Sequence, residues 1–454
     1  MPCNPSQIES YIRPGRRLHL TGIGGVSMQP LGLVLRGMGI EITGSDMSQS
    51  PSTDELIKKG IPVSIGHRAE NIEGADALIR TAAVHNDNPE IAAARALGIP
   101  IFERAQAWGH IMRSYEQAIC VAGTHGKTTT TSMVTHIFME AERDPTVMIG
   151  GYLPLLGACH RVGGGETMIM ESCEYYNSFL NFFPTVAVIL NVEADHLDFF
   201  RDLTDIQRSF RTFARLVPKD GIVISNGDDA NTQEALAGIP ACTFGFSETC
   251  DIRAVNCSEN WQDFDVLCKG ERYGHFHLNV LGRHNVCNAL AAIAAARQCG
   301  IDAETAARGL EGFRGARRRM EYKGNWNGAA LYDDYAHHPG ELRVLLDAME
   351  KVPHERILLA FQPHTYSRTY ALFDQFVREL KRVDVVVLAE IYAAREQNTI
   401  GISSADLAAR VPGSVYCATL PEVTAWLRDN ARSGDLILTV GAGDIYKAGE
   451  ALLK

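Results

Sequence analysis

The sequence predicts an α/β protein of three domains in series, each built on a largely parallel sheet covered by helices. Short apolar runs rich in β-branched residues alternate with helical patterns along almost the whole chain, and this alternation is typical of parallel sheets. The length of 454 residues exceeds what a single hydrophobic core organises. We therefore expect domains over residues 1–108, 109–317 and 318–454.

Composition and charge exclude several classes of function. Hydrophobic residues make up 46% and charged residues 21%, as in ordinary globular proteins. The net charge of −11 argues against nonspecific nucleic-acid binding, so anionic substrates would need positive charge gathered locally. The 11 cysteines form no Cys-x-x-Cys pair, which favours buried thiols in a reducing compartment. No apolar run is long enough to span a bilayer, and the stretch MPCNPSQIESYIRPGRR lacks a signal-peptide core. We expect a cytoplasmic protein without membrane insertion.

The first unit combines a glycine turn with an acidic strand end. The expected elements are a strand at residues 16–22, a helix at 26–39 and a strand at 40–46. The turn Gly22–Gly25, followed about 20 residues later by Asp46, resembles a mononucleotide-binding βαβ unit. Ser27 stands where that fingerprint has its third glycine. A purely structural tight turn fits these residues about equally well. Helix and strand signals continue through residues 76–84 and 89–108.

The second unit contains a loop suited to nucleotide phosphates. The strand at 118–122 runs into Gly123-Thr124-His125-Gly126-Lys127-Thr128, and a helical repeat of apolar residues follows. Gly123 and Gly126 let backbone N–H groups approach phosphate oxygens, and the helix N-terminus adds partial positive charge. Lys127 can reach the β- and γ-phosphates, and the Thr128 hydroxyl can hold Mg²⁺. The loop is two residues shorter than the Walker spacing. The alternative is a chance Gly-Lys-Thr at a helix start, but the strand and helix flanks favour phosphate binding and the use of ATP.

Polar side chains follow the next strands of this unit. Glu171 ends the strand near 167–172, and Asn191, Glu193, Asp195 and His196 follow the strand at 185–190. Ligands bind at the carboxyl ends of strands in such sheets. Carboxylates there can hold Mg²⁺ as oxygen ligands. On chemistry alone, His196 is a hydrogen-bonding residue before it is a ligand.

The rest of the chain continues the α/β pattern. The expected elements are a strand at 221–226, hairpin-like sequence at 243–280, a helix at 285–300, and C-terminal strands at 330–336, 357–363, 384–392 and 435–443. Asp333–Pro339 and Gln362–Arg368 place histidine, tyrosine and arginine at strand ends. A histidine pair is more often structural than catalytic. Together with the basic cluster Arg314–Arg319, these segments supply local positive charge.

These segments in this order resemble the Mur ligases, the ATP-dependent enzymes that build the peptide of peptidoglycan. The resemblance covers essentially the whole chain and rests on HLTGIGGVSM, GSD, AGTHGKTTTTSM, NVEADHLDFF, LGRHNVCNALAA, DDYAHHPGEL, FQPHTYSRT and EIYAARE. It implies an N-terminal Rossmann-like domain for a UDP-sugar, a central P-loop ATPase-type domain, and a C-terminal Rossmann-like domain for the amino acid. The implied reaction joins L-alanine to UDP-N-acetylmuramate through an acyl phosphate, with ATP and Mg²⁺ as cofactors and ADP and phosphate as products, in peptidoglycan precursor synthesis.

The resemblance also implies residue roles. The UDP-sugar would contact Gly22, Gly24, Gly25 and Asp46. ATP would contact Gly123, Thr124, His125, Gly126, Lys127, Thr128, Thr129, Asn285, Asn288, Arg319 and Asp334. Mg²⁺ would be held by Thr128, Glu171 and His196, and the amino acid by Tyr335, His337, His364 and Arg368. Lys127, His337 and Arg368 would be catalytic, with His337 as a candidate acceptor of the amine proton.

Two departures from the family pattern are visible, and a lysine that some sister enzymes use has no counterpart. Thr365 stands where many relatives have arginine, which leaves Arg368 as the clearer carboxylate partner. The segment Glu171–Asn177 is less acidic than in other members. Some sister enzymes use a carbamylated lysine after the Asp195-His196 pair, but here Arg208, Arg211 and Arg215 precede Lys219, the first lysine after that pair, so we predict none.

Other functions remain open at this point. A recycling ligase would join a preformed murein tripeptide to the same sugar nucleotide, although FQPHTYSRT argues against it. The two glycine turns, Gly22–Gly25 and Gly441–Gly443, suggest a nicotinamide oxidoreductase, which would leave Lys127 and Thr128 without a purpose. A third alternative is a non-catalytic nucleotide-binding switch. The sequence leaves open the choice among L-alanine, glycine and L-serine, and whether the protein is a monomer or a homodimer.

Overall fold

The computed structural model describes residues 5–81, 83–197, 199–394 and 396–454. Its chain forms two compact units. The first comprises the chain up to Asn256 with Phe264–His277 and Cys287–Phe313, and the second comprises Cys257–Asp263, Leu278–Val286 and Arg314–Lys454. Arg395, in the EIYAARE segment, lies outside the described residues. No helix in the described ranges is both long and apolar enough to cross a membrane.

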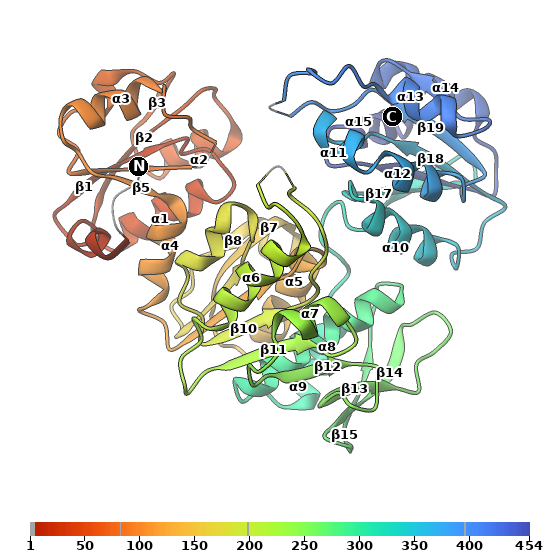
Figure 1. The fold of residues 1–454 in the computed structure, drawn as a ribbon, viewed down its shortest axis with the longest axis horizontal. Coiled ribbons are helices and arrows are strands. Elements are labelled where there is room, and N and C mark those ends of the chain that lie inside the picture. The colour runs from red at the N-terminus through yellow and green to blue at the C-terminus, as the bar shows by residue number, and fades with distance from the viewer. Residues whose placement is uncertain (1–4, 82, 198, 395) are drawn as a thin grey trace. The chain divides into compact units, whose positions relative to one another are not determined.

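The N-terminal part of the first unit is a parallel sheet with helices (Figure 1). Its elements are η1 (Pro5–Ser10), β1 (Arg17–Thr21), α1 (Met28–Gly37), β2 (Glu41–Asp46), α2 (Pro51–Lys58), β3 (Val63–Ile65), η2 (Ala69–Ile72), β4 (Ala77–Arg80), α3 (Pro89–Ala96), β5 (Ile101–Glu103) and α4 (Arg104–Met112). Within the described residues the strand order is β3-β2-β1-β4-β5, and every pair is parallel. In β4, Ala77 and Ile79 join one apolar cluster and Leu78 joins another, so both faces of the sheet are covered.

The central part of the first unit is a larger, mixed sheet. Its elements are β6 (Gln117–Ala122), α5 (Lys127–Glu140), β7 (Thr146–Leu153), η3 (Pro154–Leu156), β8 (Ala158–Arg161), β9 (Thr167–Glu171), η4 (Tyr175–Asn181), β10 (Val186–Ile189), α6 (Leu203–Ala214), β11 (Ile222–Asn226), α7 (Ala230–Ala235), β12 (Cys242–Gly245), β13 (Ile252–Val255), β14 (Asp263–Cys268), β15 (Glu271–His277), α8 (Arg283–Gln298) and α9 (Ala303–Glu311). The order among described strands is β15-β14-β13-β12-β11-β10-β6-β9-β7-β8. Its middle pairs are parallel, whereas β13 with β14 and β7 with β8 are antiparallel.

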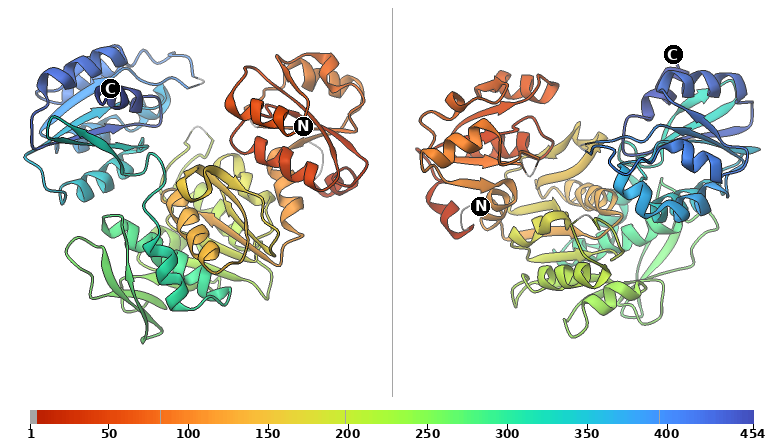
Figure 2. Two further views of the ribbon diagram at one scale, coloured as in Figure 1. Left: turned by 180° about the vertical axis from the view of Figure 1, so that it is seen from behind. Right: turned by 45° about the horizontal axis from the view of Figure 1, so that its top comes forward.

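The C-terminal sheet carries helices on both faces (Figures 1 and 2). Its elements are β16 (Glu321–Trp326), β17 (Ala329–Asp334), α10 (Pro339–Met349), β18 (Arg356–Phe361), α11 (Tyr366–Ala371), α12 (Phe373–Leu380), β19 (Val385–Ala389), α13 (Ser404–Arg410), β20 (Val415–Cys417), α14 (Leu420–Asn430), β21 (Asp435–Val440) and α15 (Tyr446–Leu452). The order is β16-β17-β21-β18-β19-β20 in the described chain, with β16 antiparallel to β17 and the other pairs parallel. Along β18, Ile357 and Leu359 face one cluster while Leu358 and Ala360 face another.

Three α/β sheets in chain order confirm the predicted fold class. The hairpin-like sequence at 243–280 contains the antiparallel pair β13 and β14. The β7–β8 hairpin was not predicted, because its glycine-rich sequence gives no clear alternation. Residue 108, the expected first boundary, lies inside α4. Residue 318, the expected start of the last domain, lies in the segment between α9 and β16.

Strand order marks where ligands are expected to bind. In the N-terminal sheet the chain leaves β1 first towards β2 and later towards β4 on the other side, so β1 is the point where the order reverses. In the central sheet β6 has the same position between β9 and β10. Open α/β sheets bind ligands beyond the carboxyl ends of the strands at such a point. The Gly22–Gly25 turn and the Gly123–Thr128 loop lie at these two strand ends.

Candidate active site

The loop from Gly123 to Thr128 joins β6 to α5. Gly123 has φ 145° and Gly126, the N-cap of α5, has φ 82°, a conformation that favours glycine. A Cβ on Gly123 would lie 2.9 Å from the Leu190 Cβ, and one on Gly126 would lie 2.6 Å from the Asn288 Oδ1. Both glycines are therefore required by close neighbours as well as by backbone conformation. The first N–H groups of α5 have no partner within the helix and are suited to an anion.

Asn191 fastens this loop to the end of β10. Its side-chain oxygen accepts the His125 N–H at 2.8 Å, and its amide nitrogen donates to the His125 carbonyl oxygen at 3.1 Å. Its own carbonyl oxygen accepts the Thr124 N–H at 3.1 Å. The Thr124 hydroxyl accepts the Glu193 N–H at 2.9 Å. These bonds hold the loop open towards the start of α5 and orient it without using the helix N–H groups.

Lys127 is held by an acidic partner. Its Nζ lies 3.1 Å from the Glu174 Oε2 and donates to the carbonyl oxygens of Gly123 and, at 3.0 Å, of Thr124. Burial opposes the charged ammonium, but the charge and hydrogen bond of Glu174, together with the acidic groups of Cys173 and Glu171, outweigh burial and raise the pKa of Lys127 above its usual value. Lys127 is therefore a fixed cation at physiological pH. It is placed at the loop where the phosphates of a nucleotide are expected.

Oxygen atoms gather beside the first turn of α5. The Thr128 hydroxyl donates to the Glu171 Oε1 at 3.1 Å, and the Glu171 Oε2 accepts the Gly150 N–H at 2.7 Å. A threonine hydroxyl and a carboxylate are the oxygen ligands that suit Mg²⁺, so these two residues fit that ion.

His196 lies beside the second acidic residue of the site. Its Nε2 is 4.0 Å from the Glu174 Oε1 and 3.8 Å from the Asp195 Oδ2. Its ring stacks on Tyr175 at a centroid distance of 4.3 Å and an angle of 23°. His196 also has a left-handed backbone, with φ 54°. The stack and the backbone together fix the direction of its ring, which is typical of a side chain used at a functional site.

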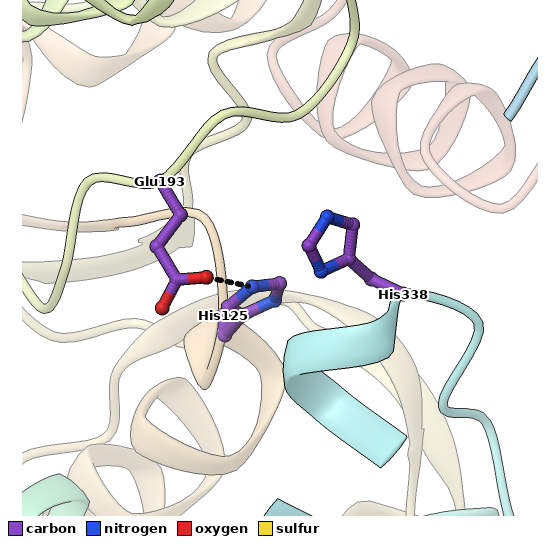
Figure 3. Close-up of side chains that lie close together, drawn as sticks. All are labelled: His125, Glu193 and His338. Atoms are coloured by element: carbon purple, nitrogen blue, oxygen red, sulfur yellow. Dashed lines mark ion pairs between the residues drawn. The ribbon is translucent and has the colours of Figure 1, made fainter. Parts of the chain in front are cut away.

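His125 faces Glu193 across the loop. Its Nε2 lies 3.5 Å from the Glu193 Oε2 (Figure 3). Both residues belong to the first unit, and the backbone of each is tied to the Asn191–Thr124 hydrogen bonds. His338, also drawn in Figure 3, belongs to the second unit, where its Nδ1 caps α10 by accepting the Gly340 N–H at 3.2 Å. The contact of His125 with Glu193 gives the phosphate loop a second side-chain anchor.

The N-terminal turn brings its predicted residues together. Asp46 Oδ2 accepts the Gly24 N–H at 2.9 Å. A Cβ on Gly24 would lie 3.0 Å from that same oxygen, and Gly22 has φ 81°. The Gly25 N–H donates to the Gly22 carbonyl oxygen at 3.2 Å. The turn is therefore closed on itself and presents the Asp46 carboxylate at the end of β2.

In the second unit the predicted amino-acid residues form one cluster. His337 makes edge contacts with Tyr335 and His364, at centroid distances of 5.5 and 5.6 Å. His364 stacks on Tyr392, and its Nδ1 lies 3.2 Å from the Arg368 Nη1. The His337 Nδ1 faces the Tyr335 carbonyl oxygen at 3.0 Å and the Glu341 carboxylate at 3.3 Å. Two acceptors place the proton on Nδ1, so Nε2 is the basic nitrogen of the neutral ring.

The basic cluster before β16 is used largely inside the second unit. The Arg318 guanidinium pairs with Asp333 at 3.0 Å and binds the carbonyl oxygens of Gly441 and Gly443. A Cβ on Gly441 would lie 2.5 Å from the Gln362 carbonyl oxygen. The glycines of this second turn are thus explained by close packing and give no support to a nicotinamide site.

Arg319 and Asp334 adjoin the same cluster. Arg319 lies over the Tyr335 ring, at 5.3 Å from its centroid. Asp334 accepts the N–H groups of Met320 and Ala336, each at 2.7 Å. Burial raises the pKa of Asp334 to about 6, although the charge of Arg319 works in the opposite direction. Through its two hydrogen bonds, the Asp334 side chain fixes the backbone next to Arg319 and Tyr335.

The two asparagines predicted for the adenine have different surroundings. Asn288 is buried in α8 and lies against Gly126. Asn285 lies in the first turn of α8, which belongs to the second unit, unlike the rest of that helix, and its side chain donates to the Leu281 carbonyl oxygen at 2.8 Å. Only Asn288 is therefore placed directly against the phosphate loop within its own unit.

Sequence reasoning missed three side chains of the first unit. Glu174 is the ion-pair partner of Lys127, and Asn191, noted only as a polar strand end, fastens the loop. Arg104 begins α4, where burial lowers the pKa of its guanidinium, while Cys173 and Glu103 act in the opposite direction. Arg104 and Lys127, both half-buried, supply the kind of local positive charge that anionic substrates of an acidic chain would need. For Glu174, the signal available in the sequence was its position three residues after Glu171, just beyond the same strand end.

Comparison with known proteins agrees with this geometry. Three family models match consecutive parts of the chain: Mur ligase family, catalytic domain, over residues 17–116; Mur ligase middle domain over 121–296; and Mur ligase, glutamate ligase domain, over 318–443. The chain is 47% identical to the UDP-N-acetylmuramate–L-alanine ligase of Agathobacter rectalis, covering 96% of this chain and 97% of that protein. It is 44% identical to the enzyme of that name from Caldanaerobacter subterraneus, covering 97% of each.

Solved structures give the same answer. The UDP-N-acetylmuramate-alanine ligase of Thermotoga maritima aligns with a TM-score of 0.80 at 30% identity, over 96% of this chain and 98% of that one. A murein peptide ligase from Psychrobacter arcticus aligns with a TM-score of 0.73 at 25% identity, over 97% and 98%. Family models, full-length relatives and solved structures agree, and the chain belongs to the Mur ligase family.

Proposed function

We propose that the protein joins L-alanine to the lactyl carboxylate of UDP-N-acetylmuramate, with ATP converted to ADP and phosphate, in peptidoglycan precursor synthesis. The observation that carries the proposal is the loop Gly123–Thr128 with Lys127 and Thr128 at the start of α5. It lies in a chain that matches relatives of this activity along nearly its whole length. A carboxylate is a poor electrophile, and a phosphate-binding loop is what an enzyme needs in order to activate one with ATP.

In the first step a carboxylate oxygen of the sugar nucleotide attacks the γ-phosphorus. The bond from that phosphorus to the β–γ bridging oxygen breaks, and ADP leaves. Two anions must approach each other, so the step depends on fixed positive charge. Lys127 supplies it, and the N–H groups at the start of α5 orient the phosphates. Asn288, which lies against Gly126, is placed to contact the nucleotide, and we assign Asn285 to the adenine on the family resemblance.

Mg²⁺ fits the oxygen donors Thr128 and Glu171, which lie 3.1 Å apart. His196 completes the proposed ligand set on family grounds, since a histidine nitrogen is not a preferred ligand for this ion. When bound, Mg²⁺ would neutralise phosphate charge and align the γ-phosphoryl group.

In the second step the α-amine of L-alanine attacks the acyl carbon, and the tetrahedral intermediate expels phosphate. We assign amino-acid binding to Tyr335, His337, His364 and Arg368. The Arg368 guanidinium suits the carboxylate of the amino acid. His337 accepts the proton that the amine loses, through Nε2. Arg319 and Asp334 are assigned to the nucleotide, as the family resemblance implies.

We assign the sugar nucleotide to the N-terminal turn, with Gly22, Gly24 and Gly25 near the diphosphate and Asp46 near the ribose. Domains over 1–108, 109–317 and 318–454 would then serve the sugar nucleotide, ATP and the amino acid. A cytoplasmic enzyme, as a monomer or a homodimer, fits these substrates.

The second candidate is a ligase that attaches a preformed murein peptide to the same sugar nucleotide. The observation that favours this candidate is the murein peptide ligase that shares the fold at a TM-score of 0.73. The curated relatives at 44–47% identity carry the alanine-adding name, so we favour free L-alanine as the acceptor.

The test is phosphate release from ATP with UDP-N-acetylmuramate and one acceptor at a time: L-alanine, glycine, L-serine, or the tripeptide. We expect release with L-alanine that depends on the sugar nucleotide and yields an amide product by mass spectrometry. Release with the tripeptide alone would establish the recycling reaction instead. No release with any acceptor would contradict ligation and favour a nucleotide-binding switch.

A further inference from the structure

A buried carboxylate in the N-terminal sheet lies outside the residues assigned above. Glu90 stands in the first turn of α3, with a relative exposure of 0%. Its Oε2 accepts hydrogen bonds from the Thr21 hydroxyl at 2.8 Å and the Ser45 hydroxyl at 2.7 Å, and it lies 3.3 Å from the His19 Nε2. Its Oε1 accepts the Asn71 side-chain N–H at 2.7 Å. One carboxylate therefore ties together β1, β2, η2 and α3.

Glu90 is held in its charged form. Burial favours the neutral acid, but the hydrogen bonds of His19, Asn71 and Ser45 outweigh burial and lower the pKa of Glu90 to about 2. A buried charge persists only when its lone pairs are satisfied by donors. Such a network has little tolerance for the loss of a member, because each buried donor would be left without its acceptor.

Two members of the network directly precede the residues assigned to the sugar nucleotide, which are the Gly22–Gly25 turn (the nucleotide turn) and Asp46. Thr21 directly precedes Gly22, and Ser45 directly precedes Asp46. The Ser45 carbonyl oxygen accepts the Gly22 N–H at 2.8 Å and the Ile23 N–H at 3.0 Å. Ser45 is thus bonded to Glu90 through its side chain and to the turn through its backbone.

A second histidine extends the network towards β3. The His67 Nδ1 lies 2.9 Å from the Ser45 Oγ. The Ser45 hydroxyl has one proton and donates it to Glu90, so His67 must donate through Nδ1. His67 follows Gly66 at the end of β3, and its Nδ1 also lies 3.6 Å from the Glu90 Oε1. The carboxyl ends of three strands are therefore linked to one carboxylate.

We propose that Glu90 is a positioning residue for the sugar nucleotide: it fixes the carboxyl ends of β1 and β2 so that the Gly22–Gly25 turn and Asp46 are preformed before binding. This inference rests on the proposed function, which assigns the sugar nucleotide to that turn. A rigid site loses less conformational entropy on binding, so the network contributes affinity without touching the ligand.

A second, more exposed carboxylate at the other end of β1 provides a control. Asp76 precedes β4 and accepts the Arg17 N–H at 2.8 Å and the Arg16 guanidinium at 2.7 Å. It fastens the start of β1, whereas Glu90 fastens its end. A substitution at either site loosens the sheet, but only Glu90 adjoins the nucleotide turn.

The experiment measures binding of UDP-N-acetylmuramate to the full chain by titration calorimetry, without ATP, for the unsubstituted protein and for Glu90→Gln, Ser45→Ala and Asp76→Asn. The Glu90→Gln amide retains the volume but cannot accept from every donor, so we expect Kd to rise about tenfold or more. The KM for ATP should stay within about twofold, since the phosphate loop is untouched. Ser45→Ala should raise Kd in the same direction, and Asp76→Asn should leave it within about twofold.

Each result has a distinct meaning. Unchanged affinity in a folded Glu90→Gln or Ser45→Ala protein overturns the inference. Equal weakening by Asp76→Asn also overturns it, because general loosening of the sheet then explains the effect. If Glu90→Gln does not fold, Ser45→Ala and Thr21→Val decide by the same criterion. Failure of the unsubstituted chain to bind the sugar nucleotide overturns the proposed function itself, which separates the two conclusions.

Discussion

The first unit contains two turns of the same architecture and different chemistry. Each follows the strand where the order of its sheet reverses, each contains a glycine with positive φ, and each leads into a helix. The loop after β6 has Lys127 and Thr128 at the helix start, and it is held by the neutral side chain of Asn191. The turn after β1 contains no lysine or arginine. It is closed by Asp46 and is linked to Glu90 through Ser45.

Under the proposed function, one backbone geometry serves two ligands. The phosphate loop uses Asn191 to occupy the N–H groups of Thr124 and His125, which leaves the helix N–H groups for phosphate. In the N-terminal turn the Gly24 N–H donates to Asp46, and this bond holds the Asp46 carboxylate at the turn. A carboxylate suits a ribose hydroxyl, whereas a lysine suits a transferring phosphoryl group. A substitution in one turn should therefore weaken binding of that turn's ligand and leave binding of the other ligand unchanged.

The largest effect is expected at the phosphate loop. Lys127→Met removes the fixed cation while keeping most of the side-chain volume, and we expect kcat to fall about a thousandfold or more. Affinity for UDP-N-acetylmuramate should be preserved, because the N-terminal turn is intact. The check is phosphate release in steady state together with calorimetric binding of the sugar nucleotide.

A control addresses the buried partner that Lys127→Met leaves behind. Glu174 would lose its ion pair, so the thermal midpoint of the variant should be compared with that of a variant carrying Glu174→Gln in addition. Substantial ligation by Lys127→Met, above about a tenth of the original rate, would contradict the role of the loop in phosphoryl transfer.

The second prediction uses the carboxylate beneath the N-terminal turn. The pKa of Glu90 in the folded protein, about 2, lies below its ordinary value of 4.5, so its ionised form stabilises the fold. This contribution is fully present above pH 4.5 and is lost as the pH falls towards 2. Its upper size is about 3 kcal/mol, from a shift of about 2.5 units. His19 and His67 are the histidines that face the same carboxylate.

The measurement is urea unfolding of the unsubstituted protein and of Glu90→Gln between pH 7 and pH 3. We expect the difference in unfolding free energy to shrink as the pH falls. Asn191→Ser provides the counterpart in the other turn, because a carboxamide does not titrate and its difference should stay level with pH. A constant difference for Glu90→Gln would contradict an ionised Glu90.

The two turns also differ in how far each could be read from the sequence. Strand, glycines, Lys127 and helix lie within about 25 consecutive residues, so local spacing and periodicity were enough to predict the phosphate loop. For Gly22–Gly25 with Asp46, local spacing predicted a turn but left a purely structural role equally open. Glu90 gave no such signal, because an acidic residue in the first turn of a helix is ordinary. Its partners His19 and Ser45 are 71 and 45 residues away.

Sheet order decides the contacts that local sequence cannot. Glu174 meets Lys127 because β9 pairs with β6, although β7 and β8 come between them in the chain. Asn191 reaches the loop because β10 pairs with the other side of β6. The residue types at these strand ends were visible in the sequence, and the register that joins them was not. In the C-terminal cluster the residue types were likewise visible at strand ends. Sheet order brings His337 and His364 together, because they follow β17 and β18, which both pair with β21.

The third prediction separates the two turns sterically. Gly126 and Gly22 have φ 82° and 81°, and an added Cβ would lie 2.6 Å from Asn288 Oδ1 and 2.8 Å from Thr81 Cγ2. We expect Gly126→Ala to raise the KM for ATP about thirtyfold and Gly22→Ala to raise the KM for UDP-N-acetylmuramate by a similar factor, with the other KM nearly unchanged in each case.

Gly15 is the matched control for both. It has φ 82° and nothing within 4 Å of an added Cβ, so Gly15→Ala introduces the backbone strain without the contact. Steady-state kinetics with each substrate varied in turn should find neither KM changed. A rise in both KM values for either Gly126→Ala or Gly22→Ala would mean that the two turns do not act independently.

The smallest expected effect concerns Asp46. Asp46→Asn keeps an oxygen for the Gly24 N–H but removes the charge, which weakens that hydrogen bond and any bond to a ribose hydroxyl. A loss of about 1 kcal/mol corresponds to a Kd about fivefold higher. Calorimetry should give the same factor for UDP and for UDP-N-acetylmuramate, since the ribose is common to both, and no change for ADP. Asp54→Asn is the control. It removes a carboxylate of α2 that is bonded to the Gln49 side chain, and it should leave all three affinities unchanged. If Asp46→Asn leaves the affinity for UDP unchanged, Asp46 serves only to close the turn, and the carboxylate that distinguishes this turn from the phosphate loop would be structural.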